Sequence, residues 1–129
     1  MKQAVIDASV AVDWLVEGHA QQAVFEFDEL LAPTHFDAEV ANGLRNIWLA
    51  QALDDRQFVT QSLRIPRLPV SRHEWLHVLP RMLELSANMT MYDAAYVALA
   101  EAYEVPLITS DARLSRAPGT RCAFEVLRR

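Results

Sequence analysis

Short apolar runs punctuate this chain, and longer segments between them repeat apolar residues every three or four positions. The short runs have the length and composition of buried strands. We predict strands at residues 2–6, 30–32 and 107–109, an extended segment at 68–70 and a last strand at 123–126. The pattern therefore gives four to five strands.

The longer segments have the apolar spacing of amphipathic helices. The first predicted helix runs through Val10 and Leu15 and stops near Gly18, and a second runs from about His19 to Asp28. Four more helices are predicted to begin at the capping-box pattern, which pairs a polar residue with an acid or amide three positions later. These pairs are Thr34 with Asp37, Asp54 with Gln57, Ser71 with Glu74, and Thr90 with Asp93. The helix that begins at Ser71 contains Pro80, which should kink or split it.

Strands that alternate with helices predict an α/β fold with a central parallel sheet covered on both faces. No repeat, low-complexity tract or Gly/Ser linker interrupts residues 1–129, so we expect a single domain. Open parallel sheets bind ligands at the carboxyl ends of their strands, near the point where the strand order switches. Candidate functional residues are therefore expected at those strand ends.

Composition is that of an ordinary globular protein, with 52% hydrophobic and 22% charged residues. The single cysteine, Cys122, cannot form an internal bridge, which favours a reducing compartment. No apolar run is long enough to span a bilayer, so we expect a cytoplasmic protein without a membrane partner. The net charge of -5 argues against coating nucleic acid by bulk electrostatics, although arginine-rich segments leave room for local phosphate contacts.

Four acids lie where predicted strands give way to turns or helices. Asp7 follows the first strand, Asp111 follows the strand at 107–109, and Glu39 and Asp93 lie early in predicted helices. If the fold brings them together, they form an all-oxygen pocket, which suits a hard divalent cation such as Mg²⁺ or Mn²⁺ better than zinc. Such a cation polarises a phosphate and lowers the pKa of a bound water, so the pocket predicts metal-assisted phosphodiester hydrolysis.

Each acid taken alone also has a structural explanation. Asp93 fits a capping box, Asp7 and Asp111 fit turn caps, and Glu39 fits a solvated helix position. The sequence around the four acids favours a shared site over four separate roles.

Four segments around these acids resemble the four motifs of PIN-domain ribonucleases, and especially of the VapC toxins. They occur in the family's order with family-like spacing and span Val5 to Leu114, nearly the whole chain. A departure occurs at Leu114, where some relatives carry a polar or acidic side chain that bears on binding of a second metal. The segments are Val5-Ile6-Asp7-Ala8-Ser9-Val10, Glu39-Val40-Ala41-Asn42-Gly43-Leu44-Arg45, Tyr92-Asp93-Ala94-Ala95-Tyr96-Val97-Ala98-Leu99-Ala100 and Leu107-Ile108-Thr109-Ser110-Asp111-Ala112-Arg113-Leu114.

This resemblance implies a PIN-like three-layer sandwich, with a central parallel sheet of four to five strands flanked by helices. The implied cofactor is Mg²⁺, for which Mn²⁺ can substitute, and the implied substrate is RNA. VapC-like proteins are usually homodimeric toxins silenced by a VapB-like antitoxin, and a housekeeping PIN nuclease in RNA processing is the alternative. The implied catalytic and metal-binding residues are Asp7, Glu39, Asp93 and Asp111, supported by the polar residues Ser9, Asn42 and Thr109.

A competing motif occurs at residues 73–77, where His73-Glu74-x-x-His77 matches the H-E-x-x-H pattern of zinc metalloproteases. That pattern works only on a helix that places both imidazoles on one face. Glu74 is already explained as a capping residue, Pro80 disturbs the helix, and no third ligand follows in a recognisable pattern.

Two further expectations concern binding. A non-catalytic binding module that kept the fold is disfavoured, because all four acids are present. Phe25, Phe27, Trp48 and Phe58 exceed the needs of one core and predict a contact with a second copy of the chain.

Overall fold

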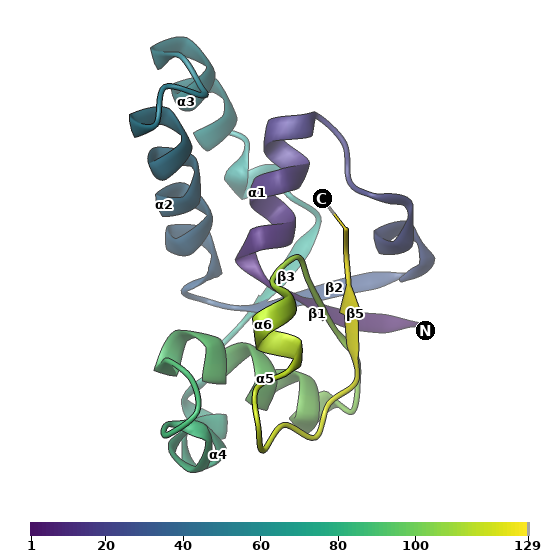
Figure 1. Cartoon of the computed structure of the whole chain (residues 1–129). Coiled ribbons are helices and arrows are strands. Elements are labelled where there is room, and N and C mark those ends of the chain that lie inside the picture. The colour runs from purple at the N-terminus through teal and green to yellow at the C-terminus, as the bar shows by residue number, and fades with distance from the viewer. Residues whose placement is uncertain (129) are drawn as a thin grey trace.

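The computed structural model describes residues 1–128 (Figure 1). The strands are β1 (Gln3–Ile6), β2 (Glu29–Pro33), β3 (Val70–His73), β4 (Leu107–Thr109) and β5 (Phe124–Val126). The α-helices are α1 (Ala8–Glu17), α2 (Phe36–Leu49), α3 (Asp55–Ser62), α4 (Leu79–Leu85), α5 (Met91–Tyr103) and α6 (Ala112–Ser115). Residues 1–128 also contain three short 3₁₀ helices: η1 (Gln22–Glu26), η2 (Ile65–Arg67) and η3 (Leu76–Val78).

The five strands form one parallel sheet in the order β3-β2-β1-β4-β5. The chain builds from β1 outward to β3 and later adds β4 and β5 on the other side of β1. Within this sheet Val5 of β1 pairs with Leu31 of β2 and with Leu107 of β4. The carboxyl ends of β1 and β4 therefore flank the switch in strand order, where open parallel sheets bind their ligands.

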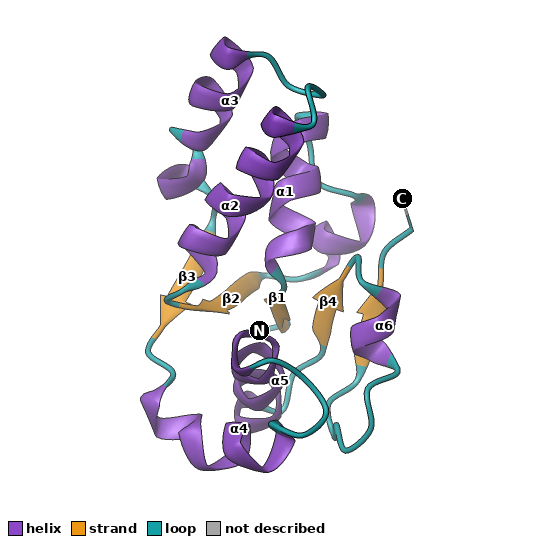
Figure 2. Ribbon diagram, turned by 60° about the vertical axis from the view of Figure 1, so that its left-hand side comes forward, coloured by secondary structure: helices purple, strands orange, loops and turns teal. Residues whose placement is uncertain are grey.

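Helices cover both faces of the sheet, as the sequence predicted. Figure 2 shows α1, α2 and α3 on one side and α4 and α5 on the other. Helix α5 is fully buried from Ala94 to Ala100, which matches its almost continuous apolar sequence. Within residues 1–128, no helix is long and apolar enough to cross a membrane.

Two of the predicted helix starts are confirmed in detail. The Asp54 carboxylate accepts a hydrogen bond from the Gln57 N–H, and the Gln57 side chain accepts one from the Asp54 N–H, which completes a capping box at α3. At α5 the Thr90 hydroxyl accepts from the Asp93 N–H at 3.1 Å. The cap at α5 is thus made by threonine and not by the Asp93 carboxylate.

The capping box predicted at Thr34 is wrong. Helix α2 begins at Phe36 after His35, without a side-chain cap bond. Asp37 instead forms an ion pair with Arg72 of β3, with Nη2 and Oδ1 2.8 Å apart. A partner from a distant strand has replaced the local cap, and it fixes the first turn of α2 to the sheet.

The helix predicted from Ser71 is also wrong, because Ser71 lies in β3 opposite Leu31 of β2. Pairing with the sheet overrides the local signal. Helix α4 begins only at Leu79, and Pro80 falls in its first turn, where a missing N–H costs no hydrogen bond.

The H-E-x-x-H segment does not lie on one helix. His73 is the last residue of β3, and its Nδ1 lies 3.0 Å from the Tyr103 hydroxyl, whereas His77 lies in η3. Glu74 accepts hydrogen bonds from the N–H groups of Trp75 and Leu76. The two imidazoles are therefore not set on one helical face, and the zinc-protease interpretation loses its structural basis.

The helix predicted from His19 to Asp28 is replaced by the 3₁₀ helix η1. The chain turns here to enter β2, and the Asp28 N–H donates to the Lys2 carbonyl at 2.7 Å. This bond beside β1 ends the segment before a regular helix can form.

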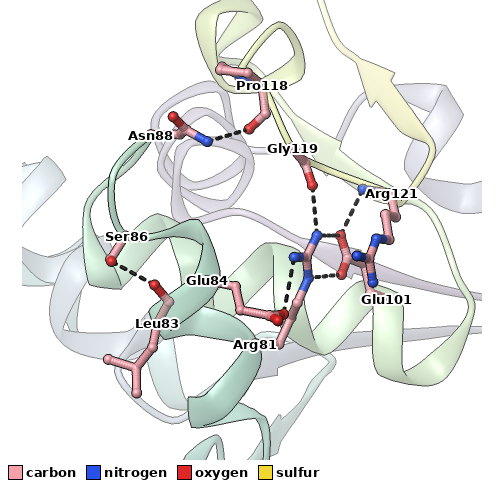
Figure 3. Close-up of polar contacts among 9 residues, drawn as sticks. All are labelled: Arg81, Leu83, Glu84, Ser86, Asn88, Glu101, Pro118, Gly119 and Arg121. Atoms are coloured by element: carbon pink, nitrogen blue, oxygen red, sulfur yellow. Dashed lines mark hydrogen bonds and ion pairs between the residues drawn. The ribbon is translucent and has the colours of Figure 1, made fainter.

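A polar cluster fastens the segment after α6 to α4 and α5 (Figure 3). Arg81 of α4 donates to Glu101 of α5 at 2.6 Å and to the Gly119 carbonyl at 2.7 Å. Glu101 also accepts from the Arg121 N–H at 2.7 Å, and Asn88 donates to the Pro118 carbonyl. These bonds fix the chain between α6 and β5 against the helical layer.

Gly43 allows α1 and α2 to pack closely, because a Cβ atom there would lie 2.6 Å from Val12 Cγ2. A helix interior ordinarily favours Ala over Gly by roughly 0.5–1 kcal/mol, but overpacking costs about 1–3 kcal/mol. We therefore expect Gly43→Ala to lower the melting temperature measured by circular dichroism. In a Val12→Ala background the clash is relieved, so the same substitution should raise it. A higher melting temperature for Gly43→Ala alone would contradict this interpretation.

Candidate metal and catalytic site

The four acids predicted from the sequence line one hollow of about 470 Å³. Asp7 directly follows β1, Asp111 comes two residues after β4, and Glu39 and Asp93 lie in the first turns of α2 and α5. Four separated segments thus supply one carboxylate each to the switch point of the sheet.

Asp7 is 8% exposed and is held by hydroxyl groups. Its Oδ2 accepts hydrogen bonds from Thr109 Oγ1 at 2.7 Å and from Ser9 Oγ at 2.9 Å. Burial raises the pKa of Asp7, while the bonds from Thr109 and Ser9 oppose that rise. Asp7 makes no side-chain cap for α1, so a capping role does not explain it.

The two hydroxyl residues also connect β4 to α1. Ser9 Oγ accepts from the Ser110 N–H at 3.1 Å, and Thr109 Oγ1 accepts from the Asp111 N–H at 2.9 Å. Ser9 and Thr109 were predicted as supporting residues, and both contact Asp7 directly.

Glu39 lies beside two residues that the sequence reasoning missed. Its Oε1 accepts a hydrogen bond from the Tyr96 hydroxyl at 2.9 Å, and His35 Nε2 lies 3.0 Å from the same oxygen. Burial, followed by the charges of Glu39 and Asp7, raises the pKa of Tyr96, so its hydroxyl stays protonated and donates. Helical spacing could have revealed both residues, since His35 precedes Glu39 by four positions and Tyr96 follows Asp93 by three.

The pKa of Asp93 reflects both its burial and repulsion by the other acids. Burial, then the charges of Asp7, Glu39 and Asp111, raise the pKa of Asp93 from 3.8 to about 6. The three like charges act on Asp93 because all four acids line the same hollow. The carboxylates are therefore electrostatically coupled and favour a cation between them.

This raised pKa predicts a pH-dependent stability for the metal-free protein. An acid with a higher pKa in the folded state contributes stability that is complete below its unfolded pKa and is lost as the pH rises through about 6. Asp93→Asn cannot ionise and escapes that loss. In EDTA, its advantage in melting temperature over the parent should grow from about pH 4 to about pH 7. An advantage that does not change with pH would contradict the assignment.

Asp111 has two roles in the structure. Its Oδ1 accepts from the Arg113 N–H at 2.9 Å and caps α6, as the simpler interpretation predicted. The same side chain lines the acid hollow. A cap uses only one carboxylate oxygen, so capping and metal binding are compatible.

A fifth acid, Asp13, lines the same hollow and was missed as a site residue. Its Oδ2 accepts from Ser110 Oγ at 3.0 Å. Asp13 lies one helical turn after Ser9 on α1, and this i, i+4 spacing could have identified it.

Asn42 is the predicted supporting residue that lies outside the acid hollow. It is exposed and lines an adjoining hollow together with His35, Ala38, Glu39 and Tyr92.

The donor set fits a hard divalent cation, because all four predicted ligands are carboxylates. No group of three or more His, Cys, Asp or Glu side chains within residues 1–128 is already arranged to hold a metal ion. One oxygen of each of three acids has a partner within the chain: Oδ2 of Asp7, Oε1 of Glu39 and Oδ1 of Asp111. Cation binding therefore needs side-chain adjustment of acids that the backbone already brings together.

A larger hollow of about 640 Å³ lies at the junction of α2 and α3. Its acids have structural partners, because Asp54 caps α3 and Asp55 accepts from Trp48 Nε1 at 2.9 Å. Size alone therefore does not make it the functional site.

Comparison with known proteins identifies related sequences. A family model described as PIN domain matches residues 4–119. Ribonuclease VapC1 of Mycobacterium tuberculosis is 37% identical over 136 residues, an alignment that covers 99% of this chain and 100% of the relative.

Solved structures share the fold at lower identity. PAE2754 from Pyrobaculum aerophilum aligns with a TM-score of 0.71 and 20% identity, covering 97% of this chain and 84% of that protein. A toxin-antitoxin complex from Klebsiella pneumoniae aligns with a TM-score of 0.65 and 19% identity, covering 95% and 99%. The three-layer arrangement predicted from the sequence is therefore the fold of these proteins.

Proposed function

This chain belongs to the PIN-domain family, and from that premise we propose that it is a metal-dependent endoribonuclease that hydrolyses RNA phosphodiester bonds. The observation that carries the proposal is the convergence of four carboxylates on one hollow at the switch point of the sheet. The relative that covers nearly the whole chain is itself named a ribonuclease. We take residues 1–129 to form one nuclease domain.

We assign metal binding to Asp7, Glu39, Asp93 and Asp111, with Mg²⁺ as the natural ion and Mn²⁺ as a substitute. When bound, the cation would neutralise phosphate charge and lower the pKa of a nearby water. Ser9 and Thr109 would hold the Asp7 carboxylate, and Tyr96 would hold that of Glu39. Such outer partners set the orientation of the groups that bind the ion.

The proposed reaction needs no side-chain nucleophile. A water oxygen gives up a proton and bonds to phosphorus, the bond from phosphorus to the leaving ribose oxygen breaks, and that oxygen takes up a proton, which leaves one RNA end with a phosphate and the other with a hydroxyl group. The hydroxyl-anchored carboxylates contribute by keeping the reacting groups in place, which reduces the ordering required when RNA binds.

The direct test is cleavage of single-stranded RNA by the purified protein. Cleavage should occur with Mg²⁺ or Mn²⁺ and stop in EDTA, because the acid pocket repels phosphate until a cation lies between them. Excess Mn²⁺ added after EDTA should restore the activity. Undiminished cleavage in EDTA would overturn the metal dependence, and a folded protein that cleaves no RNA would favour a binding module.

We also propose that this nuclease is the toxin of a VapBC-type pair, with a VapB-like antitoxin as partner. Support comes from the VapC relative and from the fold shared with a protein of a toxin-antitoxin complex. Expression of the parent should then arrest growth, and expression of Asp7→Asn should not. Unchanged growth together with RNA cleavage in vitro would favour a housekeeping role in RNA processing.

A homodimer is proposed on the basis of exposed apolar residues. Phe25 is 67% exposed, and Val59 and Leu63 of the α3 region are also exposed. Part of the predicted excess has partners within the chain, because Trp48 and Phe58 stack with ring centroids 4.7 Å apart. Light scattering should give twice the chain mass of 14.6 kDa, and a strictly monomeric protein would exclude the dimer.

A further inference from the structure

A second hollow adjoins the acid pocket along α2. Its volume is about 390 Å³, and it is lined by His35, Ala38, Glu39, Asn42 and Tyr92. Glu39 also lines the acid hollow, so the two spaces meet at this carboxylate. The volume falls within the roughly 300–1,000 Å³ of small-ligand sites.

Tyr92 forms the aromatic wall of this hollow. Its side chain directly precedes Asp93 and is 62% exposed, although it lies beside a polar site. The ring contacts His35 with centroids 5.6 Å apart, and His35 in turn contacts the buried Tyr96 edge-on at 5.2 Å. Tyr92 thus contacts one ring, His35, which itself packs on Tyr96, while most of the Tyr92 surface remains open.

Asn42 supplies a polar group to the same hollow. It follows Glu39 by three residues on α2, so the two side chains project from the same helical face. Its amide offers both donors and an acceptor and can pair with the edge of a base. The hollow therefore combines a stacking surface with a hydrogen-bonding group, beside the acids.

We propose that this hollow binds one nucleobase of single-stranded RNA, stacked on Tyr92 and hydrogen-bonded by Asn42, next to the scissile phosphate. The inference rests on the proposed ribonuclease function and names the contact that selects its substrate. Unpaired RNA bases are commonly bound by stacking on aromatic side chains. With a net charge of -5, the chain cannot rely on bulk attraction for RNA, so stacking has a larger part in its affinity.

The first test measures binding of a labelled short single-stranded RNA by fluorescence anisotropy in Mg²⁺, with Asp7→Asn protein so that the RNA stays intact. Adding Tyr92→Ala should weaken binding about tenfold, the effect of losing one base–aromatic stack. Tyr92→Phe keeps the ring and should bind as the starting protein does. Leu83→Ala is the matched control, because Leu83 on α4 is 59% exposed and lies away from both hollows. Equal binding by Tyr92→Ala would overturn the proposal.

The second test removes bases from the RNA one at a time by abasic substitution. At one position the loss of the base should weaken binding as much as Tyr92→Ala does. Combining that abasic RNA with the Tyr92→Ala protein should weaken binding no further than either change alone. Asn42→Ala should reduce the preference among the four bases at that position. Losses that add at every position would overturn the proposal.

Cleavage kinetics separate this inference from the proposed function. In protein with Asp7 intact, Tyr92→Ala should raise KM about tenfold and leave kcat within a few fold, since the acids are unchanged. Cleavage with an unaltered KM would overturn the base site and leave the ribonuclease proposal standing. RNA binding that depends on Tyr92, without cleavage, would support the base site and overturn the ribonuclease proposal. No RNA binding at all would overturn both the base site and the ribonuclease proposal.

Discussion

Asp7→Asn is expected to abolish RNA cleavage while leaving the protein folded. Asparagine keeps the shape of the side chain and can still accept from Thr109 and Ser9, so the buried contacts survive. The substitution removes a buried negative charge, which relieves repulsion and should not lower the melting temperature. Losing an outer partner of a metal ligand costs roughly 10–100-fold in affinity or activity. Loss of a ligand charge should therefore cost on the order of 100-fold or more.

The graded control for this prediction is Thr109, whose hydroxyl contacts Asp7 but not the hollow itself. Thr109→Val should reduce cleavage less than Asp7→Asn does, and Thr109→Ser should retain activity because it keeps the hydroxyl. Initial rates of RNA cleavage in Mg²⁺ and circular dichroism spectra of all three variants provide the measurements. A folded Asp7→Asn protein with full activity would remove Asp7 from the site.

The sequence contained enough information to place the acids because their positions follow from the sheet. Asp7 and Asp111 follow apolar runs, and the carboxyl ends of parallel strands meet at one edge. Asp93 comes after the Thr90 cap, which fixes where α5 begins. The position of Glu39 is less well explained by its local sequence, because the cap predicted at Thr34 does not form. Its helix was nevertheless predicted, because the apolar spacing of α2 is strong.

The errors arise where tertiary partners override local signals. Ser71 has a capping-box neighbour, but its segment pairs with β2 and its cap is never made. Asp37 likewise pairs with Arg72, whose guanidinium also donates to backbone carbonyls of the η2–β3 segment. No sequence window that holds only one partner can reveal such contacts. The Tyr96 contact with Glu39 is of the same kind, whereas His35 lies only four residues before Glu39 and was visible in the local spacing.

The two interpretations of Asp111, as a turn cap and as a site residue, predict different effects of removing its charge on the stability of the metal-free protein. Asparagine is as good an N-cap as aspartate, so Asp111→Asn should keep the bond from the Arg113 N–H. What it removes is one of the charges that raise the pKa of Asp93. The melting temperature of metal-free protein should therefore rise, by about 4 °C if roughly 1 kcal/mol of repulsion is relieved. Asp111→Ala also loses the cap, so it should gain less than Asp111→Asn does.

Adding Mn²⁺ should make the parent more stable than Asp111→Asn. A ligand that binds only the folded state stabilises it in proportion to the logarithm of its affinity. The parent should gain about 2.7 kcal/mol at one hundred times its Kd, and a tenfold weaker Asp111→Asn site should gain about 1.4 kcal/mol less. Function and stability thus oppose each other at this carboxylate, since the charge that strains the metal-free fold is the one that holds the cation. Thermal melts of parent and Asp111→Asn protein, each in EDTA and in Mn²⁺, measure both effects together. An equal Mn²⁺ shift in the two proteins would exclude Asp111 from the metal site and leave it only its capping role at α6.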